Sequence, residues 1–251
     1  MAKKFASIII CHWSNSDFRS EAMQTSITSL IANTEYPYEL IVIDNGEKDE
    51  DTDFLMQLVK KKKINFYIKN AENLNYFWGR NQGLAISNGD YIVTCDNDIQ
   101  YRRGWLAKCV SILEAYPDEK IYSTPIYNVA HWPDKYWKEP PLELNGEKWR
   151  LNRRAGSNCF VMRRKDFIKM GRWPIHNRSG TKWVEHIFNE GYWAAVTPEI
   201  MIKDLGFRQG FNFFTAFPIY FTLSDGTKVY YNCDVYCKEH PELEYREQGK
   251  F

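Results

Sequence analysis

The stretch NAENLNYFWGRNQGLAISNGDYIVTCDND, residues 70–98, holds an asparagine-rich turn, a helical pattern at 76–87 and a strand pattern at 90–95. The strand pattern ends in two carboxylates, Asp96 and Asp98, with one asparagine between them. Carboxylates at a strand end either cap a solvated turn or converge on a cation. The neighbouring segments therefore decide what this pair does.

Strand and helix patterns alternate on both sides of this stretch. The continuous apolar run at 5–11 is typical of a strand buried on both faces, and a helical pattern follows from Asp17, a candidate N-cap, to about Asn33. Further strands are expected at 38–44, 64–69 and 120–127, and further helices at 51–63 and 104–116. Short connections between such elements imply a mostly parallel sheet.

Polar side chains stand at the ends of three expected strands. His12 follows the first strand, Asp44 closes the second, and Asp96 and Asp98 follow the fourth. Ligands of parallel sheets bind at the carboxyl ends of the strands. One crevice is therefore expected to collect these four side chains.

The pattern loses its regularity between about 125 and 155, a segment rich in Trp, Tyr and Pro that we expect to form a functional or mobile loop. A strand and a short helix are expected within 157–171, a helix ending near Gly191, and one or two short strands within 193–206. The aromatic tail has a hairpin signal, SDGT, at 224–227.

Composition narrows the class of protein. The formal net charge of +1 predicts no overall field toward nucleic acid or anionic membrane, although 150–165 is locally basic. The six Cys form no CxxC pair, which indicates a reducing compartment. No apolar run approaches the length that spans a bilayer, so we expect no transmembrane segment and a cytoplasmic protein.

Residues 5–206 resemble the GT-A fold nucleotide-sugar glycosyltransferases, specifically their family-2-like group. The resemblance rests on SIIICHWSN at 7–15, YELIVIDNGEKD at 38–49, the stretch 70–98 and GWL at 104–106. It implies an α/β, Rossmann-like GT-A domain over 1–206 with a mostly parallel central sheet. Within it, 1–124 would bind the nucleotide sugar and 125–206 the acceptor, with an irregular aromatic extension, 207–251, packed on the domain.

The resemblance also assigns the donor side. A divalent cation, Mn²⁺ or Mg²⁺, stabilises the charge that develops on a departing nucleoside diphosphate. By resemblance Asp98 would bind the metal directly, and Asp96 would contact the ribose or reach the metal through water. The other residues implied at the nucleotide sugar are Asp44, which would recognise the base, His12, which would flank it, and Arg80, Asn75 and Asn97.

The second half departs from the family pattern at two places. Where the family often has a metal-binding His, this chain has Asp204, which either completes the metal site or caps a turn. Where inverting members carry an acid at a helix start, residues 179–182 have none. Glu185, about one turn later, is the candidate general base, with His186 next, although adjacent helical residues point about 100° apart. Alternatively Glu185 is a solvated or salt-bridged helix acid, and a chain without a base would be a retaining or a degenerate enzyme.

The aromatic loop offers acceptor candidates. His131, Trp132 and Trp137, with Tyr136 beside them, either bind the acceptor or form a small core under a long loop. The acceptor would be a hydroxyl on a glycan, a small molecule, a protein or a modified nucleic acid.

The expected function is transfer of a hexose or pentose from a nucleotide sugar, with UDP as the expected nucleotide, to a hydroxyl with inversion. A nucleotidyltransferase is disfavoured because the segment after the first strand, 11–18, has no glycine for a phosphate loop. A non-catalytic sugar- or nucleotide-binding protein is the non-enzymatic alternative. The basic segment 150–165 beside the Trp-rich loop favours, as a variant, transfer to modified DNA or another polyanion.

Overall fold

The computed structural model describes residues 4–14, 16–46, 48–126, 136–153, 155, 158–173, 180–205, 220–222 and 228–230. The helices are α1 Asp17–Asn33, α2 Asp49–Lys60, α3 Tyr76–Ile86, α4 Trp105–Ala115, α5 Arg164–Met170 and α6 Gly180–Asn189. The first seven strands are β1 Ala6–His12, β2 Tyr38–Asp44, β3 Phe66–Lys69, β4 Tyr91–Cys95, β5 Ile99–Tyr101, β6 Ile121–Ile126 and β7 Trp137–Leu144. The remaining strands are β8 Glu147–Asn152, β9 Cys159–Arg163, β10 Trp193–Ile200, β11 Ile202–Asp204, β12 Tyr220–Thr222 and β13 Lys228–Tyr230.

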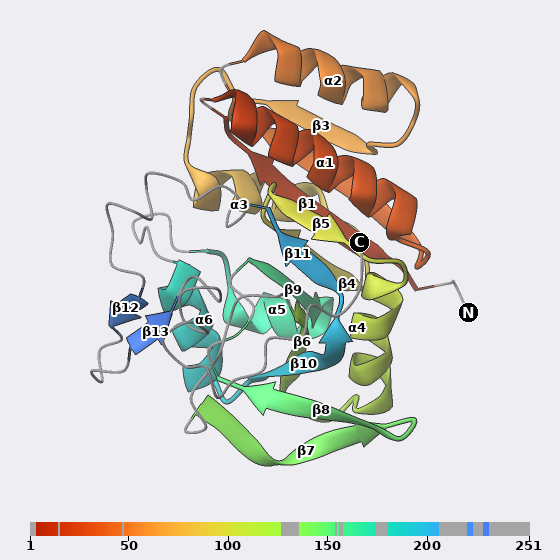
Figure 1. The fold of residues 1–251 in the computed structure, drawn as a ribbon, viewed down its shortest axis with the longest axis vertical. Coiled ribbons are helices and arrows are strands. Elements are labelled where there is room, and N and C mark those ends of the chain that lie inside the picture. The colour runs from red at the N-terminus through yellow and green to blue at the C-terminus, as the bar shows by residue number, and fades with distance from the viewer. Residues whose placement is uncertain are drawn as a thin grey trace, which may run out of the picture.

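A nine-stranded sheet in the order β3-β2-β1-β4-β9-β6-β10-β8-β7 forms the centre of the molecule (Figure 1). β1 pairs in parallel with β2 and β4, β2 with β3, and β6 with β10. β9 pairs antiparallel with β4 and β6, and β8 pairs antiparallel with β7 and β10. The sheet is therefore mostly parallel, as predicted, with β8 and β9 running against the other strands.

Each face of the sheet carries its own apolar core, because successive side chains of a strand point to opposite faces. Ile8 and Ile10 of β1 face the core that also takes side chains from α1, α2 and α4. Ile9, between them, faces the core formed with α3, α5 and α6. Both faces of β1 are covered, which explains why all seven of its residues are buried.

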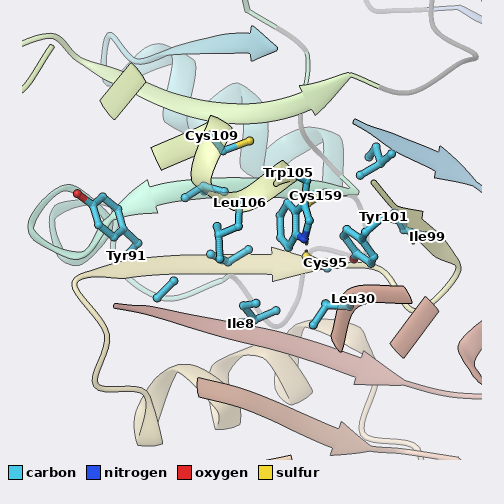
Figure 2. Close-up of a cluster of buried hydrophobic side chains, with 14 of the residues drawn as sticks. Ile8, Leu30, Tyr91, Cys95, Ile99, Tyr101, Trp105, Leu106, Cys109 and Cys159 are labelled. Atoms are coloured by element: carbon cyan, nitrogen blue, oxygen red, sulfur yellow. Dashed lines mark hydrogen bonds between the residues drawn. The ribbon is translucent and has the colours of Figure 1, made fainter. Parts of the chain in front are cut away.

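The end of β4 is anchored in the first of these cores (Figure 2). Cys95, the last residue of β4, lies opposite Cys159 of β9, and their Sγ atoms are 3.4 Å apart. Tyr101 and Trp105 pack beside them with ring centroids 4.7 Å apart. The carboxylate that follows Cys95 therefore leaves a well-packed strand.

Several predicted elements are confirmed, and two details are corrected. The side chain of Ser16, not that of Asp17, caps α1 by accepting a hydrogen bond from the Arg19 amide, and Asp17 lies in the first turn. The segment 125–155 was expected to be a loop, but its described residues include the hairpin β7–β8; the outer strand, β7, lacks the regular apolar alternation that indicates a strand. β12 and β13 pair around 224–227 as the SDGT signal predicts.

Two further features bear on the sequence-based expectations. None of the helices in the described part of the chain is both long and apolar enough to cross a membrane. The four described cysteines, at 11, 95, 109 and 159, are free and buried thiols.

Candidate active site

Three parallel strands end side by side at one edge of the sheet. His12, the last residue of β1, is in register with Asp44, the last residue of β2. On the other side of β1, Ile10 is in register with Cys95 of β4, so Asp96 emerges next to the end of β1. The predicted convergence of these polar residues at the carboxyl end of the sheet is confirmed for the backbone.

Asp96 is held by two side chains of α3. Arg80 Nη2 lies 2.9 Å from Asp96 Oδ1, and the Tyr76 hydroxyl donates to the same oxygen at 3.0 Å. The Arg80 guanidinium lies 3.7 Å from the Tyr76 ring centroid and 5.8 Å from that of Trp173. The pKa of Asp96 is raised to about 7, mainly because the carboxylate is surrounded by protein. The Arg80 guanidinium opposes this rise, and the charge of Asp98 adds to it. A further positive charge beside Asp96 would therefore stabilise its ionised form.

A short two-stranded sheet brings the backbone of Asp204 close to that of Asp98. β11 pairs antiparallel with β5, with Asp204 in register with Ile99, and the Leu205 amide donates to the Asp98 carbonyl at 2.7 Å. Burial raises the pKa of Asp98, against a smaller lowering by its own backbone amide and by the Arg19 guanidinium. Within the described ranges, however, no three or more His, Cys, Asp or Glu side chains are grouped to hold a metal ion. The third ligand predicted at Asp204 is adjacent in backbone but not assembled with the other two.

The pair of Asp96 and Asp98 nevertheless fits a hard cation. Mg²⁺ characteristically takes one or two protein carboxylates and completes its shell with phosphate oxygens and water. Both carboxylates have raised pKa values, and the charge of Asp98 contributes to that of Asp96, so a divalent cation would offset that unfavourable charge. These two residues are the part of the site that would hold the metal.

His12 is fully buried and connects two elements. Its Nε2 lies 3.1 Å from Oδ2 of Asp51, in the first turn of α2, and its Nδ1 lies 2.9 Å from Nδ2 of Asn97. Burial lowers the pKa of His12, against opposing charges from Asp44 and Asp51. The predicted neighbourhood of His12 and the Asp-Asn-Asp turn is confirmed, but the His12 ring and the Asn97 amide face each other.

Asp44 is buried with both of its oxygens in use. Oδ1 accepts from the Gly46 amide at 2.7 Å, and Oδ2 accepts from Tyr67 at 2.6 Å and Thr52 at 3.1 Å, with Lys69 Nζ 3.2 Å away. These bonds tie together the end of β2, the start of α2 and the edge strand β3. Because Asp44 is fully buried, a base could contact its carboxylate only if the residues around it move.

Asn75 is the N-cap of α3. Its side-chain Oδ1 accepts from the amides of Phe77 at 2.9 Å and Trp78 at 3.3 Å, and its φ of 72° lies in the left-handed region. With its ψ of 168° this is an extended positive-φ conformation that residues other than glycine rarely adopt. The cap fixes the start of the helix that presents Tyr76 and Arg80, so the placement of Asn75 serves Asp96 indirectly.

The catalytic candidates lie on α6, which packs against the second core through Trp183 and Ile187. His186 is exposed, and its Nε2 lies 3.2 Å from the Met170 carbonyl oxygen. Its ring lies against that of Trp183, with centroids 5.4 Å apart and planes tilted by 42°. Glu185 is half-buried on a different side of the helix. The hydrogen bond to Met170 directs His186 toward α5.

The acceptor candidates are described only in part. Trp137 begins β7, is half-buried and has the exposed Arg150 of β8 over its ring at 3.8 Å. Tyr136 is fully buried with the Arg153 guanidinium 4.7 Å from its ring centroid, as the small-core interpretation predicts. His131 and Trp132 lie outside the described residues.

Three residues of this neighbourhood were not singled out from sequence. Tyr76 stands four residues before Arg80, so helical spacing alone would place both on one face of α3. Trp173 is paired to α3 by hydrogen bonds between its backbone and the Asn81 side chain, at 3.0 and 2.9 Å. Asp51 is one of several acids in the sequence of α2, and nothing in that run distinguishes it.

Comparison with solved structures gives the fold. A structure of GalNAc-T7 with UDP, GalNAc and Mn²⁺ matches with a TM-score of 0.65 at 15% identity, over 80% of this chain and 43% of that one. The Pyrobaculum calidifontis mannosyltransferase PcManGT, in complex with GDP-Man and Mn²⁺, matches with a TM-score of 0.61 at 14% identity, over 83% and 59%. The chain has the GT-A fold that these glycosyltransferases share.

Sequence comparison gives the family. A Haemophilus influenzae protein described as a glycosyltransferase is 32% identical over 108 residues, which cover 43% of this chain and 32% of the relative. The chain spans less than half the length of the first curated relatives it matches, 32% and 48%. Residues 7–172 match the profile of glycosyl transferase family 2, and this match covers most of the chain. The chain therefore belongs to glycosyl transferase family 2.

Proposed function

We propose that this chain transfers a sugar from a nucleotide sugar, with UDP as the expected nucleotide, to an acceptor hydroxyl with inversion. Membership of glycosyl transferase family 2 and the GT-A fold support the reaction class. The observation that carries the proposal is the pair Asp96 and Asp98 at the end of β4, with Arg80 bound to Asp96. Neighbours with Mn²⁺ and either UDP or GDP-Man support a metal-dependent donor site.

On the donor side, Asp96 and Asp98 would hold Mn²⁺ or Mg²⁺, which when bound neutralises charge on the departing diphosphate. Arg80 and Tyr76 keep the Asp96 carboxylate in one orientation through their bonds to Oδ1. Holding a ligand in place before substrate arrives lowers the cost of assembling the site. Asp204 would add a carboxylate to this site once the donor is bound.

The base side of the donor would lie against the ends of β1 and β2. His12 and Asn97 line this region together, and Asp44 shapes the turn at Gly46 through its hydrogen bond to that amide. Asn75 supports the same region as the cap of α3. We propose that Asp44 recognises the base after a movement of the residues that bury its carboxylate.

On the acceptor side, Glu185 is the proposed general base. Its carboxylate takes the proton of the acceptor hydroxyl, the oxygen forms a bond to the anomeric carbon, and the bond to the diphosphate oxygen breaks on the opposite face. This displacement inverts the anomeric configuration. Trp137, with His131 and Trp132, would hold the acceptor.

The test of the reaction is donor turnover by matched variants. Asp98→Ala should abolish Mn²⁺-dependent transfer and donor hydrolysis, and Glu185→Gln should lower kcat by about 10²-fold or more. His186→Gln is the matched control on the same helix, and we expect it to keep most of the activity because its ring is directed toward Met170. A Glu185→Gln enzyme as fast as the wild type would remove Glu185 from the mechanism.

A polyanionic acceptor such as modified DNA is the second candidate, favoured by the exposed Arg150 on the Trp137 ring. Arg150→Gln should then lower the salt dependence of acceptor binding, because each phosphate contact releases counterions. Trp137→Ala with retained salt dependence would separate stacking from charge. Acceptor binding that does not change with salt would point to a neutral acceptor, and donor binding without any turnover would point to a non-catalytic protein.

A further inference from the structure

A chain of hydrogen bonds leads from α2 to the centre of the Asp-Asn-Asp turn. Asp51 Oδ2 meets Nε2 of His12 at 3.1 Å, and Nδ1 of the same ring meets Nδ2 of Asn97 at 2.9 Å. Asp51 and His12 are both fully buried, whereas Asn97 is partly exposed between the two acids. The chain therefore joins a buried carboxylate to the one residue that separates Asp96 from Asp98.

The chemistry of the three groups fixes the position of each proton. The amide nitrogen of Asn97 can only donate, so Nδ1 of His12 must be the unprotonated ring nitrogen. A neutral imidazole then carries its proton on Nε2, and that proton is donated to the Asp51 carboxylate. A carboxylate behind a histidine sets both the tautomer and the orientation of the ring.

The ring is also held sterically. A Cβ added at Gly46 would lie 2.9 Å from Asp44 Oδ1 and 3.2 Å from both Cδ2 and Nε2 of His12, so the turn after β2 lies close against the ring. Ser20 of α1 donates to the same Asp51 oxygen at 2.9 Å. The two donors to Asp51 converge on one atom, but only His12 continues toward the acidic turn.

We propose that Asp51 is a positioning residue for the metal-binding turn: through His12 it holds the Asn97 amide inward and thereby orients Asp96 and Asp98. This inference rests on the proposed function, since it assigns Asp51 a part in cation and donor binding. It explains why a carboxylate is buried in α2 at a point where an apolar residue would pack without the cost of burying a charge. Asp51 touches neither the donor nor the metal.

The test measures Mn²⁺ binding in the presence of UDP, using the electron paramagnetic resonance signal of free Mn²⁺ as the readout. Urea unfolding is measured on the same proteins. Asp51→Leu should weaken Mn²⁺ binding by about 10-fold, the lower end of the effect of losing a partner directly behind a ligand, because Asp51 acts through His12 and Asn97. Asp51→Asn keeps an oxygen that can accept from Nε2 and should recover most of the affinity. Ser20→Ala is the matched control: it should lose stability through the same Asp51 oxygen and keep wild-type Mn²⁺ affinity.

Asn97→Ala interrupts the chain at its other end and keeps the inference testable if Asp51→Leu does not fold. In the Asn97→Ala background, changing Asp51 should cost no further Mn²⁺ affinity, because its effect passes through Asn97. Wild-type affinity in Asp51→Leu or in Asn97→Ala, or losses that add in the double variant, would overturn the positioning role. A wild-type protein that binds no Mn²⁺ with UDP or GDP would overturn the proposed function itself, and this outcome is recognised before any variant is made.

Discussion

Arg80 illustrates how one residue of the site is set by its own helix. Its side chain is 2% exposed, bonded to Asp96 and stacked on Tyr76 one turn earlier. A flat guanidinium can bond a carboxylate at its edge and stack at its face, which an ammonium cannot do. The side chain of Asp96 keeps 32% exposure, so the pair lies at the boundary between core and solvent.

Two substitutions separate these contributions of Arg80. Arg80→Met removes the cation and should lower the free energy of unfolding by about 2 kcal/mol, because Asp96 loses its charged partner. Arg80→Lys keeps the charge and loses the stacking on Tyr76, so a loss of about 1 kcal/mol is expected. Urea unfolding measures both, and a Met variant as stable as the wild type would show that the pair contributes nothing to the fold.

His12 predicts a pH dependence of stability. Burial lowers its pKa in the folded protein below the ordinary value of 6.5. Because the unfolded chain then binds the proton more readily, the free energy of unfolding should fall as pH drops through 6.5, with a slope of at most about 1.4 kcal/mol per pH unit from this group.

His12→Gln provides the comparison, since glutamine has no titrating proton in this range. Urea unfolding at several pH values between 5 and 8 gives the free energy of unfolding of both proteins. This free energy should change less with pH in the variant, and differences below roughly 0.5 kcal/mol count as minor. An identical slope in both proteins would assign the pH dependence to other groups.

At the scale of elements, α3 reaches the sheet because it carries glycines on its buried side. A Cβ at Gly83 would lie 2.5 Å from Cγ2 of Ile9, on fully buried β1. Gly83→Ala should therefore destabilise the protein by about 1–3 kcal/mol through overpacking, even though alanine favours a helix. Trp78→Ala, on the exposed side of α3, is the control and should change stability by no more than about 0.5 kcal/mol. Equal effects in the two variants would mean that α3 can move away from β1.

Asp204, in the short sheet of β5 and β11, is either a metal ligand or a structural turn residue, and a substitution can separate the two. A metal ligand is sensitive to loss of its charge, whereas a turn residue needs only a hydrogen-bonding side chain. Asp204→Asn should lower Mn²⁺ affinity by about tenfold or more if the carboxylate joins the site after donor binding. Unchanged affinity, measured by titrating Mn²⁺ into the UDP-bound protein, would make Asp204 a structural residue of β11.

Some elements of the fold could be predicted from the sequence, and others could not. The apolar run of β1 and the helix pattern of α1 are strong local signals, and the structure follows them closely. The hairpin β7–β8 is not local in this sense: its inner strand buries Trp149 and Leu151 against a sheet that the local pattern does not reveal. Asp51 was likewise indistinguishable from its acidic neighbours, because its role comes from facing His12 across two elements.

At the scale of the whole molecule, the apolar cores lie on the two faces of the sheet, and the candidate site lies at the carboxyl ends of its strands. α1, α2 and α4 cover one face and α3, α5 and α6 the other, so both faces are occupied by core (Figure 1). The carboxyl ends of β1, β2 and β4 bring together charged side chains from several elements. The strand ends that form the proposed donor side could therefore be predicted from the sequence, whereas local patterns give no element for 128–135, which include the proposed acceptor residues His131 and Trp132.

The most direct test of the central claim is the melting temperature of the wild-type protein and of Asp98→Asn with UDP- and GDP-sugars, each with and without Mn²⁺. A ligand that binds only the folded state raises stability according to its concentration over Kd. We predict a rise in Tm for the wild type that needs both a nucleotide sugar and Mn²⁺, and its loss in Asp98→Asn. A nucleotide-sugar shift that is independent of Mn²⁺, or one that persists unchanged in Asp98→Asn, would contradict the assignment of Asp96 and Asp98 as the metal and donor site.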